Sequence, residues 1–196
     1  MKLKRILSLA LSGVLAVSML TACGGGGISH ILNDRSNAVR SALNGAQTML
    51  TYKASDRNLD EAIATVAESL TAGQVTNDVA DSNVAGAVRQ LTGYGDISLG
   101  EAWKAQTTVG EKTYVKVFVY NVDDSEFDEA SEVAQDVASK LDSMKLKDDL
   151  ATKGEDVTNS YKGYVSAYEK TIGTGDDAFD AWVVGVAVEQ TVKAAA

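Results

Sequence analysis

The chain contains one histidine, His30, and one cysteine, Cys23, so a catalytic device that needs an imidazole or a thiol has to use one of them. A Ser-His-Asp arrangement requires a histidine held rigidly against a serine. His30 comes seven residues after Cys23 and directly follows a segment that contains the four glycines 24–27. Because a run of glycines is conformationally free, this is a poor position for a preorganised base. We therefore expect His30 to be a surface residue.

Acidic side chains gather in two segments, 123–129 and 176–180. Oxygen-rich loops can bind Ca²⁺, which takes about six to eight oxygen ligands. Neither segment has the alternating ligand spacing and central glycine of an EF-hand loop. We expect the first to be a helix N-terminus, where carboxylates stabilise the positive end of the dipole, and the second to be a polar hairpin turn. No metal or other cofactor is predicted.

Carboxylates in pairs could also hydrolyse a glycosidic bond, normally in a cleft with aromatic walls. Trp103 and Trp182 are the only tryptophans, and Trp182 begins an apolar segment, which favours the core. Tyr164 and Tyr168 lie four residues apart in a predicted strand and therefore share a face. If that face is open, the two rings could stack a ligand; if a helix covers it, they belong to the core.

The N-terminal segment has the pattern of an export signal. Three basic residues, Lys2, Lys4 and Arg5, precede an apolar stretch from Ile6 to about Val17. This stretch is shorter than the roughly 20 residues of a membrane-spanning helix. A charged start, a short apolar core and small residues at the cleavage site are typical of secretory signals. We expect residues 1–22 to be removed from the mature protein.

The end of this segment, Leu20-Thr21-Ala22-Cys23, resembles the lipobox of bacterial prolipoproteins. The resemblance implies that the Cys23 thiol is joined to a diacylglyceryl group and that the chain is cut just before it. Residues 23–27 would then be a lipidated cysteine and a glycine tether, on the extracytoplasmic face of the cell membrane. Two or more acyl chains would anchor the protein stably. The competing interpretation is an ordinary secretory signal with a chance cysteine.

The composition of the remaining chain is that of one acidic domain, which we place at 28–196. Removal of Lys2, Lys4 and Arg5 with the signal would take the net charge from −9 to −12. A surface this acidic repels phosphate backbones, so nucleic acid is not an expected partner. With Cys23 joined to lipid, no thiol is left for a disulfide, a zinc cluster or a nucleophile.

Apolar residues at helical spacing predict helices over 28–50, 58–73 and 84–93, and the last has Leu91 on its apolar face. Ser98 and Glu101 predict a further short helix. The helical spacing of apolar residues then stops. β-Branched and aromatic residues over 113–122 predict a strand in the centre of a sheet.

A helix over 125–144 follows, capped by Ser125, with Leu141 on its apolar stripe and Asp136 toward solvent. A connector over 145–160 leads to strands over 161–171 and 181–192, joined by a turn at 173–177. The predicted fold class is α+β: N-terminal helices, then strand-helix-strand-strand, with a small, mostly antiparallel sheet covered by helices.

This order of elements resembles the CAP (cysteine-rich secretory/SCP) superfamily. The similar parts are the helix at 59–67 and a closing hairpin that contains 164–168 and 181–186. The resemblance implies a fold and no site, because that family's cavity presents two histidines and two acidic residues. This chain has only His30.

These patterns favour a membrane-anchored, non-enzymatic binding or envelope-associated domain whose protein or glycan ligand the sequence does not name. Two alternatives stay open: a carboxylate-dependent hydrolase of cell-wall glycan, and a catalytically inactive CAP-like domain. Two carboxyl groups in a pocket with an aromatic wall would favour the hydrolase. A filled core with an exposed apolar or tyrosine patch would favour binding.

Overall fold

The computed structural model describes residues 34–54, 57–100, 108–142 and 156–195. The chain divides into the units Met1–Asp34 and Arg35–Ala196, and the helices and strands described below lie in the second unit. The described residues form four α-helices and a mixed sheet of six strands, which confirms the predicted α+β class.

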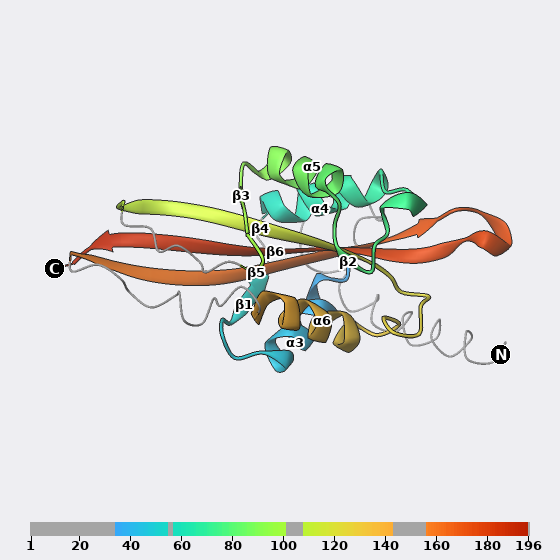
Figure 1. Ribbon diagram of the computed structural model, residues 1–196, viewed down its shortest axis with the longest axis horizontal. Coiled ribbons are helices and arrows are strands. Elements are labelled where there is room, and N and C mark those ends of the chain that lie inside the picture. The colour runs from blue at the N-terminus through green and yellow to red at the C-terminus, as the bar shows by residue number, and fades with distance from the viewer. Residues whose placement is uncertain (1–33, 55–56, 101–107, 143–155, 196) are drawn as a thin grey trace, which may run out of the picture. The chain divides into compact units, whose positions relative to one another are not determined.

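Three long strands form the antiparallel centre of the sheet: β4 (Gly110–Asn121), β5 (Val157–Ile172) and β6 (Phe179–Ala194) (Figure 1). β6 lies between the other two, and its Val184 pairs with Phe118 of β4 and Ala167 of β5. β-Branched and aromatic side chains favour this extended backbone. The predicted strands over 161–171 and 181–192 lie within β5 and β6, and the one over 113–122 covers most of β4 and extends one residue past its end.

Three short strands lie along the outer edges of this centre. β1 (Tyr52–Ala54) is parallel to β5, while β2 (Asp78–Val79) is antiparallel and β3 (Gly95–Asp96) parallel to β4. The resulting order is β1-β5-β6-β4-β2, with β3 also on β4. Tyr52 lies so close to Gly163 that a Cβ there would come within 2.6 Å of the Tyr52 ring. Strands of two or three residues have no readable period, so the sequence does not predict them.

Helices cover both faces of the sheet (Figure 1). α4 (Arg57–Glu68) and α5 (Ser82–Thr92) pack on one face, and α3 (Ser36–Ala46) and α6 (Ala130–Asp142) pack on the other. Each face has its own apolar cluster, and alternate residues of β6 supply both. The α3–α6 side receives Trp182, Val184, Val186 and Val188, and the α4–α5 side receives Ala181, Val183 and Ala187.

The helices of the α4–α5 face follow their sequence signals most closely. The Asp81 Oδ1 accepts hydrogen bonds from the backbone N–H groups of Asn83 (2.7 Å) and Val84 (2.9 Å), which caps α5. Gly93 ends this helix in the left-handed conformation, with φ of 73°. The predicted inward position of Leu91 is wrong, because 55% of this residue is exposed.

Several predicted boundaries are wrong. The helix predicted over 28–50 is described only from residue 34 onward, where α3 covers Ser36–Ala46. The helix predicted over 58–73 ends at Glu68, and a separate 3-10 turn covers Ala72–Gln74. No helix begins at Ser98, and the rest of that predicted element lies outside the described residues.

The connector predicted over 145–160 is also partly wrong, because β5 already begins at Val157. The first part of β5 contains the consecutive small polar residues Thr158, Asn159 and Ser160, which are typical of a loop when the partner strand is not known. Pairing with β6 extends the strand to Val157, which lies opposite Ala194. Long-range backbone hydrogen bonds, and not local propensity, set this boundary.

α6 begins at Ala130 and not at Ser125. The backbone N–H of Glu129 donates to Glu132 Oε2 (3.1 Å), and the Glu129 carbonyl accepts from Glu132 (3.1 Å), so Glu129 occupies the start of the helix. The preceding residues form turns that place the Phe127 ring 4.9 Å from the Tyr120 ring, centroid to centroid. Packing of Phe127 on the sheet therefore competes with an early helix start.

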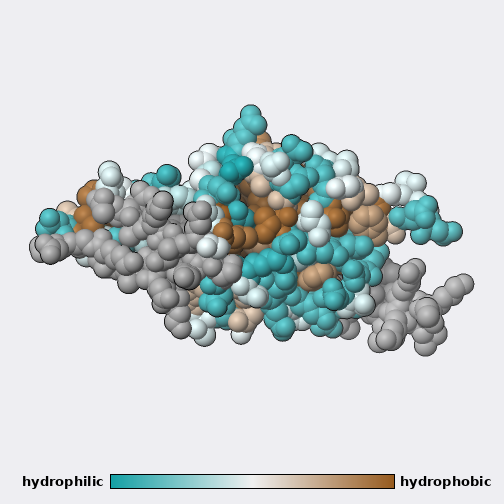
Figure 2. Space-filling view, viewed as in Figure 1, coloured by the Kyte–Doolittle hydropathy of each residue, from teal (hydrophilic) through white to brown (hydrophobic). Residues whose placement is uncertain are grey.

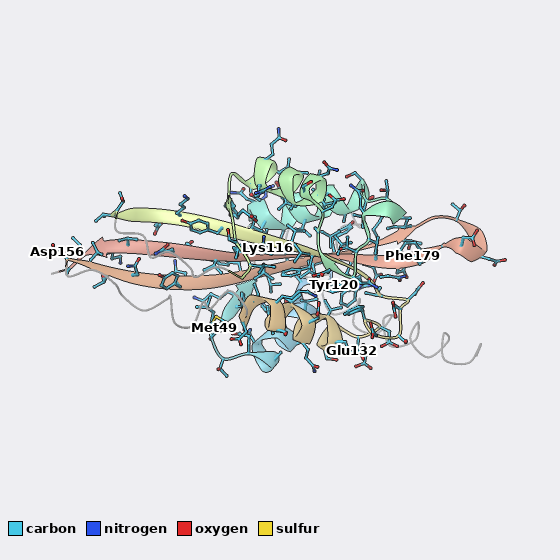
Figure 3. The ribbon with its side chains drawn as sticks, viewed as in Figure 1. Met49, Lys116, Tyr120, Glu132, Asp156 and Phe179 are labelled. Atoms are coloured by element: carbon cyan, nitrogen blue, oxygen red, sulfur yellow. The ribbon has the colours of Figure 1, made fainter. Side chains whose placement is uncertain are left out.

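The solvent-facing position predicted for Asp136 is wrong as well. Its Oδ2 accepts a hydrogen bond of 2.7 Å from the hydroxyl of Tyr120, which is fully buried between β4 and α6 (Figure 3). Of the predicted apolar stripe, Ala134, Val137 and Leu141 are buried, whereas Phe127 and Ala130 are half-buried and Met144 lies outside the described residues. Val133, which is not part of the predicted stripe, is buried as well. On the side shown in Figure 2, hydrophilic surface covers the helices, and apolar surface gathers in a band between the two helical layers.

Leu141→Ala is expected to lower the free energy of unfolding by about 2–5 kcal/mol, because it leaves a cavity under α6. Leu141 is 1% exposed. Gln135→Ala is the matched control in the same helix; its exposed side chain predicts a change within about 0.5 kcal/mol. Denaturant melts of the mature chain measure both values. Equal, small effects would contradict the packing of α6 on the sheet.

Candidate functional site

The residues singled out in the sequence are found in different places. Cys23, His30 and Trp103 lie outside the described residues. Tyr164 and Tyr168 share the sheet face that α4 and α5 cover. Tyr168 is 3% exposed, so it belongs to the core, whereas Tyr164 is half-buried at the margin of the same cluster. The two rings therefore do not form an open stacking platform.

The acidic segments 123–129 and 176–180 meet at one end of the sheet, where their side chains hold loops in place. The Asp123 Oδ2 accepts from the Asp180 N–H (3.3 Å), and the Asp180 Oδ1 accepts from the Thr171 hydroxyl (2.6 Å). The Asp124 Oδ2 accepts from the Asn77 side chain (3.2 Å). Within the described residues, no group of three or more His, Cys, Asp or Glu side chains is arranged to hold a metal ion.

A recurring arrangement in this fold is a carboxylate that accepts a hydrogen bond from an aromatic side chain and also pairs with a cation. Asp136 binds the Tyr120 hydroxyl and the Lys140 ammonium, and Lys140 reaches Asp78 at 3.2 Å. Burial and then Asp136 raise the pKa of Tyr120 well above its ordinary value.

The same arrangement recurs three more times around the sheet. Glu169 accepts from Trp182 Nε1 (2.7 Å) and binds the Arg35 guanidinium at both oxygens (2.8 and 3.0 Å). Two further sets have the same form, namely Tyr168–Glu68–Lys170 and Tyr164–Glu189–Lys162. Each of these carboxylates is engaged by an aromatic donor and by a cation, both at Oδ2 in Asp136, so a structural role accounts for each of them.

A buried amide pair lies on the α3–α6 face of the sheet. The Gln190 Nε2 donates to Asn159 Oδ1 (2.7 Å) and to the Tyr161 hydroxyl oxygen (3.2 Å). Within the part of the chain that the structure describes, one atom of each amide, Gln190 Oε1 and Asn159 Nδ2, has no hydrogen-bond partner. Gln190 is only 1% exposed, so this pair costs stability and offers no access to a ligand.

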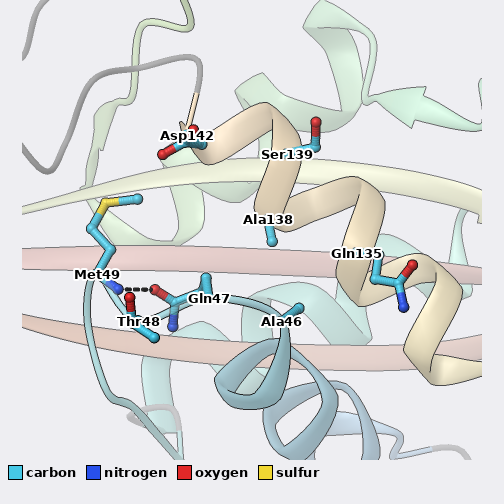
Figure 4. Close-up of a pocket in the computed structure, with 8 residues that line it drawn as sticks. All are labelled: Ala46, Gln47, Thr48, Met49, Gln135, Ala138, Ser139 and Asp142. Carbon is cyan, nitrogen blue, oxygen red and sulfur yellow. Dashed lines mark hydrogen bonds between the residues drawn. The ribbon is translucent and has the colours of Figure 1, made fainter.

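A pocket of about 370 Å³ lies between the loop that follows α3 and the second half of α6 (Figure 4). This volume is within the range of small-ligand sites. The loop contributes residues 46–49, and the helix contributes Gln135, Ala138, Ser139 and Asp142. Methyl and thioether groups line part of the pocket, and neutral polar groups and one carboxylate line the rest.

Two carboxamides hold the loop that forms one wall. The Gln47 Oε1 accepts from the N–H groups of Met49 (2.7 Å) and Leu50 (3.0 Å), and its Nε2 donates to the Leu50 carbonyl (2.6 Å). Asn44 makes a matching pair of hydrogen bonds with the backbone N–H (2.8 Å) and carbonyl (2.9 Å) of Tyr52. Side chains thus replace a strand partner, and the wall is preorganised.

Four polar side chains of the pocket are in the opposite situation. Within the described part of the chain, no hydrogen bond or ion pair engages the side chains of Thr48, Gln135, Ser139 and Asp142. The pocket is therefore a place where hydrogen-bonding groups and apolar surface are both available to a ligand. Sequence reasoning missed it because its residues are ordinary surface types, brought together only by the packing of α3 on α6.

No protein-family model, curated protein or solved structure matches this chain. Among the described residues, none of the helices has the length and apolarity that a membrane span requires.

Tyr52 and Tyr120 are expected to make the folded protein sensitive to alkali. Burial raises the pKa of Tyr52, as it does that of Tyr120, above the ordinary value of 10.0. Above that pH the unfolded chain loses both protons while the folded chain keeps them, so the free energy of unfolding falls with pH. The contribution is intact below pH 10.0 and declines above it. Each tyrosine should account for about 1.4 kcal/mol per pH unit.

Denaturant melts at pH values on both sides of this range measure the slope, and tyrosinate absorbance reports ionisation in the folded state. Tyr120→Phe is expected to remove about half of the decline, because one of the two withheld protons is gone. A slope unchanged by this substitution would show that the Tyr120 phenol ionises within the folded protein.

Proposed function

We propose that this chain is a bacterial lipoprotein, anchored through Cys23 on the extracytoplasmic face of the cell membrane, whose domain binds a ligand without transforming it. The anchor is supported by the basic residues Lys2, Lys4 and Arg5, the short apolar stretch and the lipobox-like Leu20–Cys23. The glycines 24–27 would give the domain a short, flexible tether.

The observation that carries the binding function is the α3–α6 pocket. Its wall is held by Gln47, whereas the side chains of Thr48, Gln135, Ser139 and Asp142 are not engaged within the described part of the chain. A ligand that enters would bury the apolar floor and complete hydrogen bonds without first breaking others. Such a site provides recognition and contains no nucleophile paired with a base.

A carboxylate-dependent glycan hydrolase is less well supported. That reaction needs two carboxyl groups on opposite sides of the scissile bond, about 5–10 Å apart. Asp78 and Asp136 are brought together by the fold, but Lys140 contacts both of them. Neither residue lines the pocket, whose single carboxylate is Asp142. The CAP resemblance adds no site residue to the proposal, because His30 is the only histidine.

Cys23→Ala is expected to abolish lipid attachment, because the acyl chains are joined to this thiol. In a bacterial host, the wild-type protein should take up labelled fatty acid and remain with the membrane fraction. The variant should be unlabelled and either unprocessed or shed. Ser29→Ala, a comparable change beyond the predicted cleavage site, should behave as wild type. Wild-type protein without label would contradict the proposed anchor.

The binding site is tested separately, on the mature chain carrying Cys23→Ala, by a nuclear magnetic resonance screen with small-molecule fragments. Fragments that bind should shift the backbone amides of residues 46–49 and 135–142. Ser139→Trp should remove these shifts, because the indole fills the pocket from an exposed position. Ser131→Trp, on the same helix but outside the pocket, is the matched control. Fragment shifts that persist in Ser139→Trp, or that never reach these residues, would contradict the site.

A further inference from the structure

The α3–α6 pocket lies where two helices end. α3 ends at Ala46 and α6 ends at Asp142, and both residues line the pocket. The C-terminus of a helix carries the negative end of its dipole and unsatisfied carbonyl groups. Two such termini therefore act on the same small volume.

Among the described residues, the lining contains no positive charge to balance these termini. These lining residues include no Lys, Arg or His, and the last turn of α3 has no basic residue. The last turn of α6 has Lys140, but its ammonium is paired with Asp136 and Asp78. Lys140 does not line the pocket.

Asp142 adds a third source of negative potential. It is the last residue of α6, a position where a carboxylate is electrostatically unfavourable unless a cation is near. Within the described residues, no cation pairs with it. The half-buried carboxylates Asp136 and Glu169, in contrast, each have a cationic partner.

We propose that this pocket binds the side chain of a lysine from a partner protein. The proposal rests on the binding function proposed above. The aliphatic stem of the lysine packs on the methyl and thioether groups of Ala46, Met49 and Ala138, and its ammonium meets the Asp142 carboxylate. The ammonium has three donors; Asp142 accepts one, and the hydroxyl oxygens of Thr48 and Ser139, which also line the pocket, are candidate acceptors for the other two.

Charge and shape favour this ligand over a metal ion. Ca²⁺ takes about six to eight oxygen ligands. The described lining offers one carboxylate and only a few neutral side-chain oxygens, which is too few for such a site. A macromolecular source agrees with the exposed Asp128 and Glu129 at the other end of α6, which favour approach of a basic surface.

The probe is the peptide acetyl-Gly-Lys-Gly-amide, titrated into the mature chain carrying Cys23→Ala and followed by backbone amide shifts. The norleucine peptide acetyl-Gly-Nle-Gly-amide has a similar aliphatic stem and no charge. We expect the lysine peptide to shift the amides of Thr48, Met49, Ser139 and Asp142 and to bind at least about threefold more tightly than the norleucine peptide. Added salt should weaken only the lysine peptide.

Asp142→Asn should weaken the lysine peptide by about threefold to tenfold and leave the norleucine peptide unchanged. Asp176→Asn, the same change in charge at the exposed tip of the β5–β6 hairpin, should have no effect. Ser139→Lys should supply the missing cation from within the chain. It is expected to raise the midpoint of thermal unfolding and to abolish the response to the lysine peptide.

Equal binding of the two peptides at the pocket would overturn the lysine proposal and leave the binding function in place. No response of the pocket to the lysine peptide would also overturn it, and the fragment screen with Ser139→Trp then decides on the binding function independently. If Asp176→Asn weakened the lysine peptide as much as Asp142→Asn does, the attraction would come from the net charge of the protein. That result would also overturn the assignment to this pocket.

Discussion

Residues Ala181–Val188 of β6 are all buried, because the strand lies between β4 and β5 and also between two layers of helices. Side chains of a strand alternate between its faces, so this one segment supplies both apolar clusters. A shift of one residue in register would exchange the two sets and turn Trp182 to the face on which Gly185 and Ala187 now accommodate α4. A Cβ on Gly185 would come within 2.5 Å of Ile63, so the close approach of α4 depends on this register.

The polar networks follow from the same constraint. Helices cover the middle of the sheet, so charged and hydroxyl groups are placed at its margins, where strands leave the covered region. There, Glu169 joins the Trp182 indole to the Arg35 guanidinium, and Asp136 joins the Tyr120 hydroxyl to Lys140. A buried polar atom without a partner costs about 1–3 kcal/mol, which explains why the aromatic donors are satisfied.

The α3–α6 pocket differs from the rest of the surface in this respect. α3 and α6 pack against each other, and both terminate beside the loop that Gln47 holds. A folded domain normally neutralises helix C-termini with basic residues or with capping groups. Here Lys140 is committed elsewhere, and Asp142 increases the negative potential. Within the described residues, this partly apolar recess therefore keeps an uncompensated negative potential, which is a property that a recognition site can use.

From the sequence by itself, the export and lipidation pattern up to Cys23 is a prediction. The sequence also determined the α+β class and most of each long strand, and the structure confirms these features. Periodicity also located α4, α5 and the apolar stripe of α6. These features are local: a period of 2 or 3.6, or a glycine at position 93, is readable within one segment.

Only the tertiary structure decided the rest. Pairing with distant strands created β1, β2 and β3 and extended β5 to Val157, and packing of Phe127 on Tyr120 delayed the start of α6. The pocket joins residues 46–49 to 135–142, about ninety positions apart in the chain and of ordinary surface type. Whether Asp136 or Asp142 has a cation depends on where Lys140 points, and the packing of α6 on the sheet determines that direction. Contacts between segments far apart in sequence leave no periodic trace in either segment, so the candidate site could be recognised only after the chain had folded.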